Sequence, residues 1–319
     1  MSCASLSLDL DNEWSYLKTH GDPAWEQYPS YLDVVVPRVL EVTARLGLRI
    51  TVFIVGQDAA LERNHPALRS IAAAGHEIGN HSFHHEPWLH LYDRAELERE
   101  ITDSTAAIAN ATGARPRGFR GPGFSCSLAT LEVLQAHGYD YDASTFPTYI
   151  GPLARAYYFM TAKLTPEERA QRKALFGSMR DGLRPLRPYR WELAGGSLVE
   201  IPVTTFPVLK IPIHFSYILY LATLAPPLAL PYFRAALAAC RLAGLTPSLL
   251  LHPLDFIGCD DVTTLSFFPA MNKTGAAKLR VLESALRALQ QNFEVIPVGE
   301  HAARIADGRR SPVIVPNFG

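Results

Sequence analysis

The segment LRITVFIV, Leu48–Val55, is the strongest indicator of the fold class, because every residue in it except Arg49 is apolar or β-branched. A run of this kind is typical of a parallel strand that is buried on both faces. A helical pattern precedes it at Tyr31–Leu46 and is closed by Gly47, and another follows at about Asp58–Ala74. Helices on either side of one buried strand predict an α/β fold with a parallel sheet.

The same alternation extends in both directions along the chain. Further strands are predicted at Ala4–Leu10, His76–His81, Arg117–Arg120, Tyr139–Ser144, Ser197–Val203, Ser248–Pro253 and Phe293–Val298. Further helices are predicted at Arg94–Ala111, Leu128–His137 and Thr274–Gln291. This rhythm favours a parallel α/β barrel or a doubly wound sheet. We expect one catalytic domain over 1–319, with a lid inserted at about 147–192 and an apolar insertion at about 206–235.

Composition excludes several classes of protein. Hydrophobic residues make up 48% and charged residues 19%, which suits a large buried core and not a disordered chain. The net charge of −1 lacks the basic excess of a nucleic-acid binder. The four cysteines form no C-x-x-C pair, so a zinc knuckle or dithiol redox motif is not predicted. The N-terminal segment has no signal-peptide pattern, so we expect a cytoplasmic protein, peripheral at the inner membrane face if it contacts lipid.

Two acids follow the first predicted strand. Residues two apart on an extended chain point the same way, so Asp9 and Asp11 can converge on one site. In parallel α/β folds the active site lies at the carboxyl ends of the strands, where both acids fall. The alternative is a pair of loop acids that cap the next helix.

A histidine-rich segment, GNHSFHH, follows another predicted strand. His81 and His85 are four residues apart, a spacing that places two imidazoles on one face of a helical turn and suits a divalent metal. With Asp11 they would supply two nitrogen ligands and one oxygen ligand and leave coordination positions open, as in catalytic sites. The alternative is a polar loop rich in histidine, and some of the nearby histidines must be bystanders.

Two further segments carry groups that could assist a reaction. An apolar strand runs directly into His252, which makes this histidine a candidate general acid, and Asp255 could accept from its ring and raise its pKa. The segment FRGPGF supplies a fixed cation, Arg120, and a glycine-rich backbone that could offer N–H donors to an oxyanion. Gly-Pro-Gly is also simply a turn.

The order of these motifs resembles that of the polysaccharide deacetylase superfamily (carbohydrate esterase family 4), in the branch that opens with D-x-D. The motifs are D-x-D at 9–11, H-S-x-x-H at 81–85, R-x-P at 120–122, Y-D-x-S at 141–144 and L-x-L-H at 249–252. The resemblance runs from Leu6 to about Asp255. It implies a distorted (β/α)7-type barrel that hydrolyses N-acyl, and sometimes O-acyl, groups with one divalent metal.

The resemblance also implies roles for individual residues. Asp9 would be the general base, oriented by Arg120, and His252 would protonate the leaving amine. Asp11, His81 and His85 would hold the metal, zinc first, with cobalt, manganese or iron as alternatives. Where the family's third motif commonly reads R-P-P-Y-G, this chain has RGPGF, and we place oxyanion donors around Phe124. Asp142 is the nearest match to the fourth motif, with Asp255 as a rival partner of His252.

The apolar insertion has no Asp, Glu, Lys or Arg from Ile211 to Phe233. Its length would permit a membrane span, but Pro212, Pro226, Pro227 and Pro231 argue against one straight helix. A span within the barrel would also separate catalytic residues on two sides of a bilayer. Two alternatives remain: a helix pair buried over the barrel, or peripheral docking on a membrane through 211–233.

The function predicted is metal-dependent hydrolysis of an N-acyl group, acetyl or formyl, from an amino sugar that is lipid- or nucleotide-linked. Aromatic residues of the lid region, Tyr189 and Trp191 among them, are expected to stack on the sugar. One alternative is a hydrolase of a cyclic amide or imide in the same fold. The other is a catalytically silent protein that binds a glycan or lipid carrier.

Overall fold

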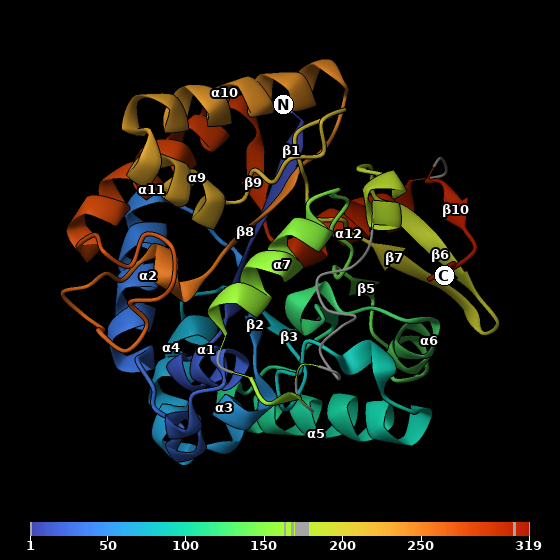
Figure 1. The fold of residues 1–319 in the computed structure, drawn as a ribbon. Helices are drawn as coiled ribbons and strands as arrows, with labels where there is room; N and C mark the ends of the chain where they lie inside the picture. Colours follow the sequence, from blue (N-terminus) through green and yellow to red (C-terminus); the bar gives the residue numbers. More distant parts are fainter. Residues whose placement is uncertain (1, 163, 167–168, 170–178, 309–310, 319) are drawn as a thin grey trace.

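The computed structural model describes residues 2–162, 164–166, 169, 179–308 and 311–318. Strand β1 (Cys3–Leu10) lies at the centre of the sheet, parallel to β2 (Thr51–Ile54) and to β8 (Ser248–Leu251). The short strand β9 (Glu294–Ile296) pairs with the beginning of β1. Figure 1 shows β1 running through the molecule to the face where the strands end.

The sheet closes into a barrel of seven parallel strands. From β2 it continues through β3 (Glu77–Asn80), β4 (Gly118–Phe119), β5 (Tyr141–Asp142) and β7 (Gly196–Glu200). The chain beyond β7 then meets β8, where the Thr204 N–H donates to the Ser248 carbonyl oxygen at 2.8 Å. The predicted (β/α)7-type barrel is confirmed.

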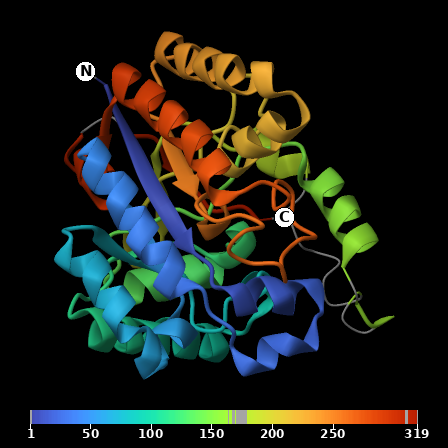
Figure 2. The same cartoon turned by 90° about the vertical axis from the view of Figure 1, so that its left-hand side faces the viewer.

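Helices cover the outside of the barrel (Figure 2). They are α2 (Leu32–Leu46), α3 (Gly56–Ala60), α4 (His65–Ala73), α5 (Arg94–Thr112), α6 (Leu128–Ala136), α11 (Gly275–Asn292) and α12 (Val298–Asp307). The single helix predicted at 58–74 is wrong: it is broken after Ala60, and Pro66 stands in the first turn of α4. A short helix that was not predicted, α1 (Glu13–His20), follows the two aspartates and is capped by Asn12.

Strand β1 shows how the sequence positions the site. All eight of its residues are buried. Its even positions are apolar and pack in the main core, as Leu6, Leu8 and Leu10 do. Its odd positions carry polar side chains, and Ser7 and Asp9 contact Arg120. Because side chains alternate along a strand, one short sequence supplies both the core and the site.

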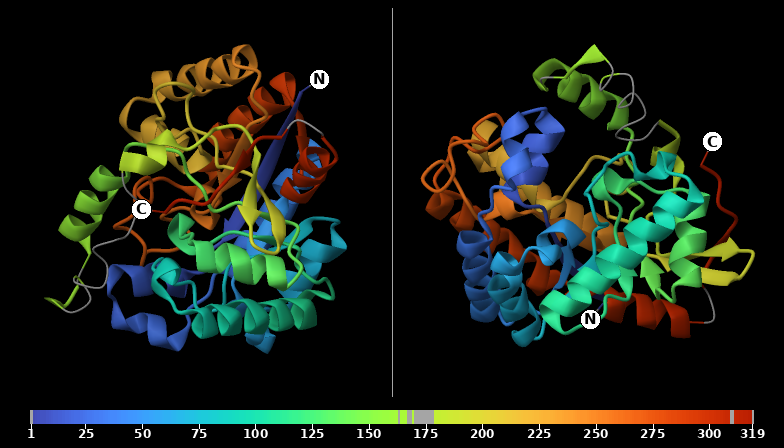
Figure 3. Two further views of the ribbon diagram at one scale, coloured as in Figure 1. Left: turned by 90° about the vertical axis from the view of Figure 1, so that its right-hand side faces the viewer. Right: turned by 90° about the horizontal axis from the view of Figure 1, so that it is seen from below.

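The segment predicted as a lid, at about 147–192, is described in part. It holds helix α7 (Gly151–Thr161), and its residues 163, 167–168 and 170–178 lie outside the described residues. The basic stretch RPLRPYRW, Arg184–Trp191, runs into a strand. Its end forms β6 (Tyr189–Leu193), antiparallel to β7, and β10 (Val313–Ile314) pairs with β6. Figure 3 shows this hairpin in yellow beside the C-terminal segment.

The apolar insertion forms two helices, α9 (Phe215–Leu224) and α10 (Pro226–Leu242), that pack on each other and on α11 (Figure 1). Phe215, Phe233 and Leu237 are buried in the main core. The prediction of a buried helix pair therefore holds for one face of the insertion. No helix in the described part of the chain combines the length and apolarity needed to cross a membrane.

Candidate active site

Three side chains converge beyond the end of β1. His81 Nε2 lies 3.3 Å and His85 Nε2 lies 3.0 Å from the same oxygen, Oδ1 of Asp11. One ligand atom from each residue falls within 4.8 Å of the other two, and Asp11 and His81 are buried. Among the described residues this is the one cluster of three or more metal-ligating side chains. The sequence prediction of these three residues as one set agrees with the geometry.

The histidine loop is not the helical turn that the spacing suggested. Residues 81–88 form no helix, and Ser82 and His85 adopt left-handed backbone conformations with φ of 63° and 55°. Buried Glu100 of α5 secures this loop by accepting from the backbone N–H groups of Phe83 and His84 at 2.8 and 3.1 Å. The His84 ring also pairs with Glu100, so His84 is a bystander to the cluster.

The protonation of the cluster suits a cation. His81 Nδ1 hydrogen bonds to the Arg120 carbonyl oxygen at 2.6 Å, which assigns the proton to Nδ1 and leaves Nε2 toward Asp11. Burial would raise the pKa of Asp11, but His85 and His81 outweigh it and hold that pKa well below its ordinary value. A carboxylate and two imidazole nitrogens that face one point form a donor set that accepts zinc and similar divalent ions.

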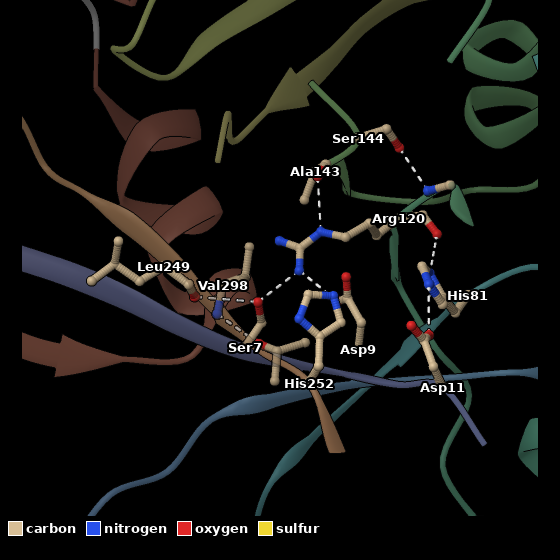
Figure 4. Close-up of polar contacts among 12 residues, drawn as sticks. Ser7, Asp9, Asp11, His81, Arg120, Ala143, Ser144, Leu249, His252 and Val298 are labelled. Carbon is tan, nitrogen blue, oxygen red and sulfur yellow. Dashed lines mark hydrogen bonds and ion pairs between the residues drawn. The ribbon is translucent and has the colours of Figure 1, made fainter. Parts of the chain in front are cut away.

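Arg120 is fully buried and holds Asp9. Its Nη1 donates to Asp9 Oδ1 at 2.6 Å and to Ser7 Oγ at 2.7 Å. Its Nε donates to the Ala143 carbonyl oxygen at 2.9 Å, and its guanidinium stacks over Phe53. The orientation of Asp9 by Arg120, expected from the family resemblance, matches these contacts (Figure 4).

The prediction for Asp255 is wrong in one respect. Its carboxylate accepts from the backbone N–H of His252 at 2.8 Å and does not hold the ring. The ring partner is Ser216 of α9, whose Oγ lies 3.0 Å from His252 Nδ1. A second histidine of the insertion, His214, lies beside them with its ring centre 5.6 Å from that of His252. Neither Ser216 nor His214 could be predicted, because no local pattern links them to His252, which lies 36 residues beyond Ser216 in the chain.

Asp142, the other candidate partner of His252, forms a buried pair with Glu200 instead. It is in register with Glu200 across β5 and β7, and both residues are fully buried. Burial raises the pKa of Glu200 well above its ordinary value, and it raises the pKa of Asp142 as well. Ser144 donates to Asp142 at 2.5 Å, while Thr145 and Trp191 donate to Glu200. Glu200, which was not predicted, ties three strands together.

A cavity of about 1750 Å³ opens over the site and has a predominantly aromatic and aliphatic lining. Phe124 lies in its wall against Phe146, but its backbone N–H already donates to the Gly121 carbonyl oxygen at 3.0 Å. That N–H is therefore not free for an oxyanion. Tyr189 and Trp191 also line the cavity, but both side chains are 0% exposed. Stacking of a substrate on their rings therefore stays a prediction.

Residues 25–141 match the family model for polysaccharide deacetylase. A peptidoglycan deacetylase of Helicobacter pylori is 32% identical over 112 residues, which are 35% of this chain and 37% of that protein. The aligned region thus spans well under half the length of this curated relative.

Solved structures show the same fold. A crystal structure described as a polysaccharide deacetylase from Mycobacterium smegmatis superposes with a TM-score of 0.65 and 22% identity, over 99% of this chain and 94% of that one. Puue allantoinase superposes with a TM-score of 0.55 and 16% identity, over 97% and 92% of the two chains. These superpositions show the fold, whereas the predicted resemblance to polysaccharide deacetylases is confirmed by the match of the family model to residues 25–141.

Proposed function

We propose that this chain, which matches the polysaccharide deacetylase family model over residues 25–141, is a metal-dependent hydrolase that releases an acetyl or formyl group from the nitrogen of an amino sugar. One observation carries the proposal. Asp9, the cluster of Asp11, His81 and His85, and His252 all line one cavity, and Figure 4 draws Asp9 between His252 and Asp11. A base, a cation site and an acid are thus arranged around one end of the barrel.

Asp11, His81 and His85 would hold the metal ion, through one carboxylate oxygen and two Nε2 atoms. When bound, a divalent ion supplies Lewis-acid polarisation of the acyl carbonyl and lowers the pKa of a water. The backbone of Arg120 fixes the His81 ring by accepting from Nδ1, as partners of metal-bound histidines do. Arg120 therefore serves both the cation site and the base.

Asp9 would take the proton from the attacking water, with its carboxylate held in one orientation by Arg120. His252 would give a proton to the departing amine, which is a poor leaving group without one. The carbonyl carbon gains the oxygen of water while its bond to nitrogen breaks, so the products are the free amine and the carboxylic acid.

For the substrate we propose an amino sugar that carries an apolar carrier, with lipid-linked ahead of nucleotide-linked. The cavity supports this substrate class, because its volume of about 1750 Å³ exceeds what a single sugar needs. Its wall includes the apolar side chains of Leu153, Tyr220, Phe267 and Phe268. Leu224 and Leu228 at the turn between α9 and α10 are 67% and 58% exposed, which supports peripheral contact with a membrane through 211–233. A cytoplasmic location stays a prediction.

The test is metal content by elemental analysis, together with acetate and formate release, in wild type and in the double variant His81→Ala/His85→Ala. His84→Ala is the matched control, because His84 stands in the same loop and pairs with Glu100. Wild type and control are expected to hold about one equivalent of metal, and the double variant none.

The alternatives predict different results. A silent binding protein would take up no zinc, cobalt or manganese and release no acid from any acylated amine. A cyclic amide hydrolase would bind the metal but open hydantoin-type rings in preference to N-acyl sugars. Either result would replace the proposed function.

A further inference from the structure

We infer that Ser216 is a positioning residue for His252, holding the ring of the proposed general acid so that Nε2 faces the substrate. The inference rests on the proposed function for its catalytic meaning. It assigns a role in the reaction to the apolar insertion, which otherwise reads as a packing element over the barrel.

The contact itself is specific. Ser216 stands in the first turn of α9 and lines the cavity, with Oγ 3.0 Å from His252 Nδ1. A serine at this place in a helix could instead bond to its own helix backbone, but the contact that the structure gives is with the ring. His252 follows β8 directly, so the two residues come from different elements and meet through packing of α9 on β8.

A buried acid, Asp255, lies close to Ser216 and the ring. Burial raises the pKa of Asp255, and His252 and a hydrogen bond from Ser216 act in the opposite direction. If the Ser216 hydroxyl donates to Asp255, its oxygen accepts from Nδ1–H. Nδ1 then keeps its proton, and Nε2 is the atom that gains and loses one. This is the arrangement that a general acid needs, since only Nε2 is left for the amine.

The other ionisable groups around the ring do not replace Ser216. Asp255 binds the backbone N–H of His252, and Lys278 bonds to the Leu254 carbonyl oxygen. Asp9 is paired with Arg120. Burial, with His252 and Arg120, holds the pKa of His214 well below its ordinary value, and burial raises the pKa of Tyr16. Among the described residues no carboxylate forms an ion pair with the ring, and Ser216 is the residue whose side chain hydrogen bonds to it.

The kinetic test compares Ser216→Ala, Ser216→Thr and His252→Ala on two substrates. One is an N-acetylated amino sugar, whose amine must be protonated to leave. The other is 4-nitrophenyl acetate, whose phenolate leaves without a proton. Thr223→Ala is the matched control, because the Thr223 hydroxyl lies on the same helix and, within the described ranges, donates to the Leu219 carbonyl oxygen of that helix instead of to a cavity residue.

Ser216→Ala should lower kcat for the amide about 10- to 100-fold, the effect of losing a hydrogen bond to a charged group. Cleavage of the aryl ester should stay near wild type, and Ser216→Thr should recover most of the amide activity. Equal losses on both substrates, or an unchanged amide rate in Ser216→Ala, would overturn the inference. A wild type that holds metal but cleaves neither substrate would instead count against the proposed function.

A measurement that needs no substrate tests the role of Ser216 separately from the proposed function. Nitrogen NMR of the histidine rings at alkaline pH should find His252 with its proton on Nδ1 in wild type. The same ring should shift toward the Nε2–H form, which is preferred in free imidazole side chains, in Ser216→Ala. A wild-type ring that already carries its proton on Nε2 would contradict the inference whatever the activity.

Discussion

Arg120 and Asp9 form an ion pair of 2.6 Å between side chains that are 0% and 5% exposed. Two charges removed from water in this way stabilise the fold only while both are present, because each compensates the burial of the other. The pair is therefore sensitive to any change that removes one partner.

Arg120→Leu should destabilise the protein by about 3–5 kcal/mol, because it leaves the Asp9 carboxylate buried without its cation. It should also abolish activity. Asp9→Asn also leaves a buried charge, that of Arg120, without its counter-charge, but it keeps a hydrogen-bond acceptor for Arg120. It should therefore cost less stability than Arg120→Leu and fold, yet lose about 10²- to 10⁴-fold in kcat with metal retained. Urea unfolding, metal analysis and kinetics check the three statements together. An active, stable Arg120→Leu would show that Asp9 needs no partner.

His301 should make the protein less stable in mild acid. Burial, with help from Arg304, lowers the pKa of His301 to about 4, while Ser5 and Thr246 hydrogen bond to its ring. The unfolded chain binds this proton near the ordinary pKa of about 6.5. Protonation therefore stabilises the unfolded state relative to the folded state as pH falls from about 6.5 to about 4. The free energy of unfolding should drop by about 2 kcal/mol between pH 7 and pH 5 from this residue alone.

Chemical denaturation of wild type and His301→Gln at both pH values measures this drop. Gln keeps hydrogen-bonding capacity but cannot titrate, so its pH dependence should be flatter. A variant with the same slope as wild type would assign the acid sensitivity to other groups.

The buried Asp142–Glu200 pair should make the protein less stable as pH rises, the opposite of the effect of His301. Burial raises the pKa of both carboxyl groups, so the folded protein keeps a proton that the unfolded chain releases above about pH 4. Stability is thus fully present below the unfolded pKa values and falls as pH rises through the folded ones. Asp142→Asn, which supplies the hydrogen without titrating, should weaken the loss of stability toward alkaline pH. Melting temperatures measured across pH for wild type, Asp142→Asn and the surface control Asp140→Asn test this. If Asp142→Asn showed the same pH dependence as wild type, the pair would not be involved.

Membrane contact is testable at the turn between α9 and α10. Leu224→Glu with Leu228→Glu should weaken sedimentation with vesicles of anionic phospholipid, because both side chains are exposed and apolar. Unfolding free energy should change by less than about 0.5 kcal/mol per site, as at other surface positions. Leu242→Glu, 91% exposed at the other end of α10, is the matched control. Equal binding by all three proteins would remove the membrane proposal without touching the hydrolase.

Much of the barrel could be predicted from sequence because its signals are local. The run at 48–55, the alternation along 4–10 and the glycine after α2 each follow from a few neighbouring residues. The errors arose where contacts between distant segments outweigh local preference. The two histidines meet through left-handed residues stabilised by Glu100 instead of a helical turn, and Tyr189–Leu193 becomes a strand because β7 and β10 offer it partners.

Which chemistry-bearing residues stand at strand ends follows from the amino-acid sequence alone, since the side-chain period of a strand and the carboxyl-end rule are properties of short segments. Which of these residues touch depends on the packing of distant segments. Asp255 has the closer place in sequence to His252, yet Ser216 holds the ring, because packing of α9 against β8 brings its hydroxyl to 3.0 Å. Partner choice depends on how whole elements pack, and no period within one segment records it.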